Sequence, residues 1–84
     1  MKWSDIKFKN HLVVKGGIRA KVVFPNGEWC SIVGGSDGSL YGDGVTTFEI
    51  MSSSTEKNIN TVKGWLSKKQ VMSHLRYLKN KEVA

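Results

Sequence analysis

Residues 18–33, IRAKVVFPNGEWCSIV, contain two apolar runs on either side of a turn sequence. The first run, residues 18–24, is rich in β-branched side chains, and residues 28–33 form the second. Pro25-Asn26-Gly27 between them is typical of a hairpin turn, because proline presets φ at the first turn position and glycine accepts a left-handed backbone. The stretch therefore predicts a β-hairpin.

The register of this hairpin depends on the type of turn. A type I turn closed by a G1 bulge, which we expect, pairs Phe24 with Glu28. A two-residue Asn26-Gly27 turn would instead pair Phe24 with Trp29 and move Trp29 to the opposite face. In the expected register, one face carries Ile18, Ala20, Val22, Phe24, Cys30 and Ile32, and the other carries Arg19, Lys21, Val23, Trp29, Ser31 and Val33.

Glycine-rich residues 34–44 separate the hairpin from a further strand. Five glycines in eleven residues predict a loop, since each lowers the stability of regular structure. Residues 45–51, VTTFEIM, place Phe48 and Ile50 in alternation with polar neighbours, which predicts a strand with one wet face. A polar stretch, residues 52–60, follows it.

Two weaker signals flank these elements. Ile6 and Phe8 alternate with charged residues, which is compatible with an edge strand. Residues 61–66 predict a short strand or an extended lead-in, with Trp65 and Leu66 as core anchors.

The last element is predicted to be a helix. Ser67-Lys68-Lys69-Gln70 has the form of a capping box, so the helix should begin there. Val71, Leu75 and Leu78 then recur at the spacing of a buried stripe, with Met72 beside it. We therefore expect an α+β fold: one domain over residues 1–84, in which a small, mainly antiparallel sheet of three to five strands packs against one C-terminal helix.

Composition limits the class of protein. Hydrophobic residues make up 39% of the 84 residues and charged residues 24%, which excludes a disordered chain, a coiled coil or a transmembrane helix. The N-terminus lacks the apolar run of a signal peptide, and a lone Cys30 cannot form an intramolecular disulfide. We expect a protein of the reducing cytoplasm, with no membrane partner.

The net charge of +6 is concentrated near the C-terminus. Residues 1–56 carry six basic and six acidic side chains and sum to zero. The excess comes from Lys57, Lys63, Lys68, Lys69, Arg76, Lys79 and Lys81, set against Glu82. Such asymmetry fits an anionic partner, and it also fits a solvated helix face.

Residue types that carry out catalysis or bind metals are scattered. Asp37 and Asp43 lack the spacing of a calcium loop and are interpreted as turn residues. Cys30, His11 and His74 do not make a zinc motif, and Cys30 in a strand is expected to be a buried, inert thiol. We therefore expect no catalytic site, metal or cofactor.

The most informative binding candidates are basic and aromatic. Trp29 beside Arg19 and Lys21 would give a base-stacking platform next to charges that neutralise phosphate, if the G1-bulge register holds. The alternative is that Trp29 is a half-buried sheet residue. The predicted helix adds further candidate binding residues, namely Lys68, Lys69, Arg76 and Lys79.

Several short motifs in order along the chain resemble a group of small proteins encoded by tailed bacteriophages and prophages. They include Ser4-Asp5-Ile6-Lys7-Phe8, Gly16-Gly17-Ile18, Phe24-Pro25-Asn26-Gly27, Ser31-Ile32-Val33 and Gly64-Trp65-Leu66-Ser67. Such proteins typically lack an assigned activity. The helix here is more basic than in those proteins, so no functional residue is transferred.

The resemblance implies a protein made in a bacterial host cell, where many small phage products bind a host macromolecule. Our leading hypothesis is therefore a non-enzymatic accessory protein that binds a host protein or nucleic acid through the exposed sheet face or an uncovered sheet edge. The alternatives are a nucleic-acid-binding module that uses this face and the basic helix, and a self-associating protein, such as a homodimer.

Overall fold

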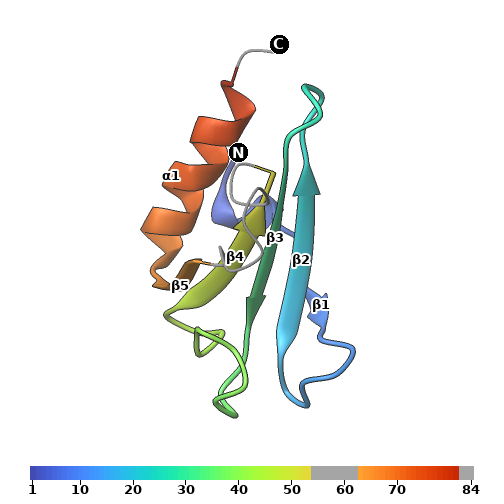
Figure 1. The fold of residues 1–84 in the computed structure, drawn as a ribbon, viewed down its shortest axis with the longest axis vertical. Coiled ribbons are helices and arrows are strands. Elements are labelled where there is room, and N and C mark those ends of the chain that lie inside the picture. The colour runs from blue at the N-terminus through green and yellow to red at the C-terminus, as the bar shows by residue number, and fades with distance from the viewer. Residues whose placement is uncertain (54–62, 82–84) are drawn as a thin grey trace.

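The computed structural model describes residues 1–53 and 63–81, which form a five-stranded antiparallel sheet with a C-terminal helix on one face (Figure 1). The elements are η1 (Trp3–Asp5), β1 (Lys9–Asn10), β2 (Ile18–Val23), β3 (Trp29–Gly34), β4 (Phe48–Ser52), β5 (Lys63–Leu66) and α1 (Lys68–Lys79). The strand order β1-β2-β3-β4-β5 follows the order of the chain. This arrangement confirms the expected α+β class.

The β2–β3 hairpin has the G1-bulge register. Val23 lies opposite Trp29, and the amide of Phe24 donates to the carbonyl oxygen of Glu28 at 2.8 Å. Gly27 has φ of +87°, the left-handed conformation that this turn requires. Trp29 therefore lies on the face opposite to the apolar face of the hairpin.

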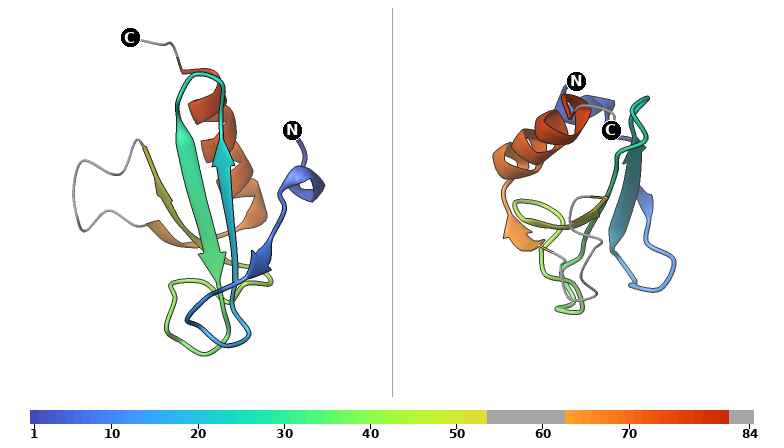
Figure 2. Two further views of the ribbon diagram at one scale, coloured as in Figure 1. Left: turned by 90° about the vertical axis from the view of Figure 1, so that its right-hand side faces the viewer. Right: turned by 45° about the horizontal axis from the view of Figure 1, so that its top comes forward.

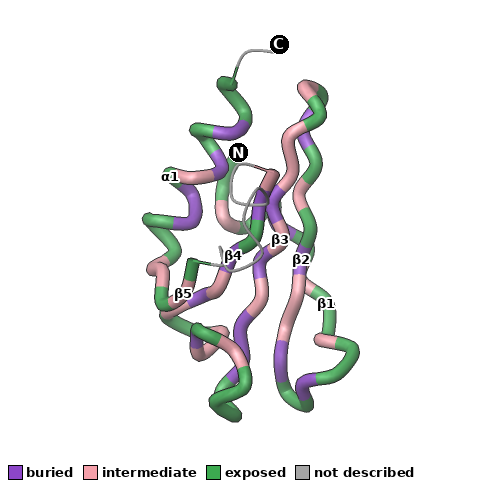
Figure 3. The backbone as a smooth tube through the Cα atoms, in the orientation of Figure 1, coloured by how far each residue is buried: buried purple, intermediate pink, exposed green. Residues whose placement is uncertain are grey.

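The core lies between α1 and one face of the sheet. In the side view, β2 and β3 stand in front of the helix (Figure 2), and buried residues alternate along β3 and β4 (Figure 3). The core cluster comprises Ile6, Ala20, Phe24, Cys30, Ile32, Phe48, Ile50, Val71, Met72, Leu75 and Leu78. Trp3 closes the cluster at the N-terminal side, with its ring 4.8 Å from that of Phe48 between centroids.

Strand β4 begins at Phe48, three residues later than the sequence predicted. One carboxylate oxygen of Asp43, Oδ1, accepts hydrogen bonds from the amides of Val45, Thr46 and Thr47 at 2.7–2.9 Å. These amides are therefore used in a tight turn and cannot join a strand ladder. From Phe48 to Ser52 the predicted alternation is confirmed.

Helix α1 begins as predicted. The Gln70 amide donates to Oγ of Ser67 at 3.2 Å, and the Ser67 amide donates to Oε1 of Gln70 at 2.8 Å, which completes the capping box. Val71, Leu75 and Leu78 are buried, so the stripe read from the sequence is the packed side of the helix.

The prediction that Trp65 anchors the core was wrong. Its side chain is 61% exposed, and its backbone has φ of +58°, which aims the residue away from the core. Its amide donates to the carbonyl oxygen of Tyr41 at 2.6 Å and so leaves the ladder with β4. Leu66, the other predicted anchor, does pack against the core. The polar stretch of residues 52–60 and the start of residues 61–66 lie largely outside the described residues.

The N-terminal strand is shorter and later than expected. Ile6 is buried in the core, whereas the ladder with β2 involves only Lys9 and Asn10. Phe8 packs beside Trp3, with ring centroids 5.5 Å apart. The segment around Ile6 therefore serves mainly to cover the core.

Candidate binding surfaces

The face of the sheet opposite α1 is the first candidate surface, and we name it the open face. It comprises Lys9, Arg19, Lys21, Val23, Trp29, Ser31, Val33, Glu49 and Met51, which the strand register places side by side. Two of its apolar side chains are well exposed, Val23 at 65% and Met51 at 39%. Exposed apolar side chains grouped on one sheet face are typical of a docking surface.

Trp29 holds a fixed position on the open face. The ammonium group of Lys21 lies 4.9 Å from the centre of its ring, within the range of a cation–π contact. The Trp29 amide donates to Oγ of Ser53 at 3.1 Å. The side chain is half-buried, so Trp29 is both a structural residue of the sheet and a contact available to a partner.

The charges of the open face are mixed. Lys9 lies opposite Arg19 in the sheet, and Nε of Arg19 donates to the carbonyl oxygen of Asn10 at 3.3 Å. Glu49 supplies a carboxylate on the same face and accepts a hydrogen bond from the Tyr41 amide at 3.2 Å. The open face is therefore only moderately cationic.

The seven binding residues predicted from the sequence do not form one surface. The structure brings Arg19, Lys21 and Trp29 together on the open face. The four basic residues of α1 lie in the other layer of the molecule, because α1 packs on the opposite side of the sheet; they are Lys68, Lys69, Arg76 and Lys79. A single ligand of modest size cannot contact both groups.

The second candidate surface is the flank of α1 that carries those four residues. With 3.6 residues per turn, they fall within about 100° of one another around the helix axis. The helix contains no acidic residue. Lys68 extends over the Trp3 ring, with its ammonium group 5.5 Å from the ring centre. This side of the helix thus faces the N-terminal segment and is strongly cationic.

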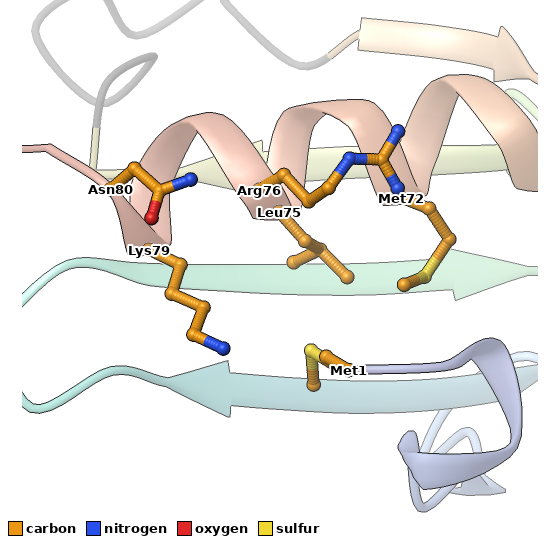
Figure 4. A pocket seen from close by; sticks show the side chains of 6 residues that line it. All are labelled: Met1, Met72, Leu75, Arg76, Lys79 and Asn80. Carbon is orange, nitrogen blue, oxygen red and sulfur yellow. The ribbon is translucent and has the colours of Figure 1, made fainter.

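A hollow of about 160 Å³ lies at the C-terminal end of this flank (Figure 4). It is lined by Met1, Met72, Leu75, Arg76, Lys79 and Asn80. Met1, Met72 and Leu75 supply apolar walls, and Lys79 extends from α1 towards β2 (Figure 4). No sequence pattern predicts this hollow, because its walls come from residues that are far apart in the chain, Met1 and residues 72–80.

The reactive side chains are engaged in the fold. Cys30 is fully buried, and burial raises the pKa of its thiol to about 12, so the thiolate is absent at neutral pH. Nε2 of His74 lies 2.8 Å from Oγ of Ser52, whose side chain is also fully buried. Nδ1 of His11 accepts hydrogen bonds from the amides of Val13 and Val14 at 3.1 and 3.0 Å.

The acidic residues of the glycine-rich loop are turn residues, as the sequence indicated. Oδ1 of Asp37 accepts a hydrogen bond from the Ser39 amide at 2.8 Å. Hydrogen bonds to the carboxylate, the Thr47 and Val45 amides first, lower the pKa of Asp43 well below its ordinary range. Within residues 1–53 and 63–81, no three or more His, Cys, Asp or Glu side chains gather in a way that could hold a metal ion.

Over the same described ranges, none of the helices has the length and apolar character needed to cross a membrane. No protein-family model, curated protein or solved structure matches the chain. The two surfaces therefore have to be interpreted from their own chemistry.

Proposed function

We propose that this protein is a non-enzymatic accessory protein of a phage or prophage that binds a host protein through its open face in the bacterial cytoplasm. The observation that carries the proposal is the group of Val23, Trp29 and Met51 on a sheet face that no other element of the described residues covers. Interfaces of this kind combine an apolar, aromatic centre with a charged rim. Arg19 and Lys21 supply that rim. The phage context rests on the sequence resemblance.

A protein partner accounts for the open face better than a nucleic acid. A base could stack on Trp29 only by displacing the Lys21 ammonium group that lies over the ring. The basic residues of α1, which a phosphate backbone would need, are in the other layer. The carboxylate of Glu49 would also repel phosphate at one end of the face.

The non-enzymatic part of the proposal is supported by the burial of Cys30 and of Ser52, the hydroxyl that lies beside a histidine. The Cys30 thiol and the Ser52 hydroxyl are both fully buried, so neither can reach a substrate in the folded protein. The Ser52–His74 pair resembles a nucleophile and base in its distance, but it joins β4 to α1 inside the fold. We interpret the pair as a structural hydrogen bond.

The test is capture of partners from bacterial lysate by the tagged protein, with and without nuclease, using two matched variants. Val23→Asp puts a charge on the open face, whereas Val13→Asp makes the same change in the β1–β2 loop, where Val13 is 87% exposed. We expect a protein partner that survives nuclease, is lost with Val23→Asp and is kept with Val13→Asp. Circular dichroism checks that both variants fold.

Three outcomes would contradict the proposal. Equal capture by the two variants would place the binding site outside the open face. Release of all bound material by nuclease would indicate that the partner is a nucleic acid. A mass near twice 9.4 kDa by light scattering, abolished by Val23→Asp, would show that the open face binds a second copy of the chain.

A further inference from the structure

The hollow beside α1 combines apolar walls with a cationic rim, and this combination limits what can fill it. Met72 and Leu75 form walls continuous with the core, while Arg76 and Lys79 stand at the rim. Neither Arg76 nor Lys79 forms an ion pair with an acidic side chain of the described residues. A ligand that carries both an apolar group and negative charge would satisfy both parts.

The size of the hollow fits one side chain of a binding partner. Its volume of about 160 Å³ is close to that of an engineered cavity that holds benzene. Pockets for cofactors and other small molecules are usually roughly two to six times larger. The space therefore fits one aromatic or large aliphatic side chain of a protein partner.

The walls favour an apolar side chain over a nucleobase. Two of the three apolar walls are methionines, Met1 and Met72, whose flexible thioethers adapt to different apolar shapes. Bases of single strands bind by stacking on aromatic rings, and none of the residues that line the hollow is aromatic. Tyr77 is on α1 but turns about 100° away from Arg76 around the helix axis.

We propose that this hollow is a docking site for an acidic peptide segment of a protein partner. The segment inserts one large apolar side chain between Met1, Met72 and Leu75, and its carboxylates pair with Arg76 and Lys79. Lys68 and Lys69, on the same flank of α1, extend the cationic surface along the helix. Because α1 and the open face belong to opposite layers, this site is separate from the surface of the proposed function.

The test is fluorescence anisotropy with a fluorescein-labelled peptide of twelve residues, in which a central phenylalanine is flanked by glutamates and aspartates. A second peptide replaces the phenylalanine by alanine and keeps every charge. We expect the first peptide to bind at least about tenfold more tightly, since burial of one aromatic side chain contributes that much or more. Binding should also weaken as salt is raised, because the rim is exposed.

Three protein variants locate the site. Lys79→Glu should weaken binding by about tenfold through charge reversal at the rim. Lys15→Glu, the same change at an exposed position in the β1–β2 loop, should leave it within about twofold. Trp29→Ala on the open face should bind the peptide as the unchanged protein does. For each variant, secondary structure and thermal melting like those of the unchanged protein show that it is folded.

Equal affinity for the phenylalanine and alanine peptides would overturn the proposal, because the hollow would then be unfilled. Tighter binding of an oligothymidylate of equal charge, with displacement of the peptide, would assign the flank to nucleic acid and overturn it as well. Equal effects of Lys79→Glu and Lys15→Glu on peptide binding would also overturn it, because the peptide would then be attracted by the net charge of the protein alone.

Discussion

The side-chain amide of Asn26, in the β2–β3 turn, donates to the carbonyl oxygen of Leu78 in the last turn of α1 at 2.8 Å. The same amide lies 3.0 Å from the carbonyl oxygen of Lys81, and Oδ1 of Asn26 accepts a hydrogen bond from the Glu28 amide at 3.0 Å. The final carbonyls of a helix have no partner within it. One asparagine therefore shapes the hairpin turn and caps a helix that begins more than forty residues later.

Asn26→Asp should destabilise the protein by about 1–3 kcal/mol, because it replaces the donor with a carboxylate that faces helix carbonyls. Oδ1 keeps its turn hydrogen bond, so the loss reports on the contact with α1. The measurement is the midpoint of urea unfolding at constant slope. Asn10→Asp, in the exposed strand β1, is the matched control and should change stability by less than about 0.5 kcal/mol. Equal shifts in both variants would contradict the capping role.

Gly42 lies so close to β4 that no side chain fits. A Cβ atom there would be 2.6 Å from the Cα atom of Phe48, which is backbone and cannot turn aside. Gly42→Ala should therefore lower the free energy of unfolding by about 2–3 kcal/mol. Gly38→Ala, at a left-handed position with open space around it, should lower it by only about 1 kcal/mol. Thermal melting of the two variants checks this order, and a reversed order would refute it.

The burial of His74 predicts how stability varies with pH. Burial, and then the charge of Lys63, lowers the pKa of His74 below its ordinary value of 6.5. Below that value the unfolded chain takes up a proton more readily than the folded protein, so stability falls as the pH drops below 6.5.

The midpoint of thermal unfolding should therefore decrease from pH 7.5 to pH 5. His74→Gln, which does not titrate and can still hydrogen-bond to Ser52, should flatten this dependence. An unchanged slope would show that other groups cause it. Asp43 affects stability in a separate pH range. Because its pKa is lowered in the folded protein, the stability it contributes is lost only as the pH falls below the ordinary value of 3.8.

Trp65→Gly should change the free energy of unfolding by less than about 1 kcal/mol, although it removes the largest type of side chain. The side chain is mostly exposed, and glycine relieves the left-handed backbone at this position. A buried tryptophan would be worth about 3–5 kcal/mol. Urea unfolding separates the two cases. A decrease of the larger size in the free energy of unfolding would show that the Trp65 side chain is part of the core.

Local chemistry explains which parts of the fold could be predicted. The G1-bulge register follows from Pro25-Asn26-Gly27 alone, and the start of α1 follows from the Ser67–Gln70 capping box, because each signal lies within a few residues. The partners of Asn26 are Leu78 in α1 and Lys81 just after it, 52 and 55 residues away, and no local sequence pattern predicts them. The sequence indicated a turn residue at Asp43 but not that the turn extends over Val45, Thr46 and Thr47, because these three residues have high strand propensity.

The candidate site shows the same division. The sequence placed Arg19, Lys21 and Trp29 on one face, since the alternation along β2 and β3 fixes their side. The sequence did not show how far the basic residues of the helix lie from that face, and the structure places these four residues in the other layer. The hollow depends on Met1 and α1 lining the same space, an arrangement that only the tertiary fold creates.

The strand order has a consequence for how the chain folds. Each strand of the sheet pairs with the strand that precedes or follows it in the chain, so no strand must wait for a distant partner. Pairing strands that are adjacent in the chain costs less loop-closure entropy than pairing distant ones, and folds built in this way form faster than those with crossed connections. We therefore expect the protein to fold faster than a sheet of equal size with crossed connections, while its core is completed only when α1 packs on the sheet.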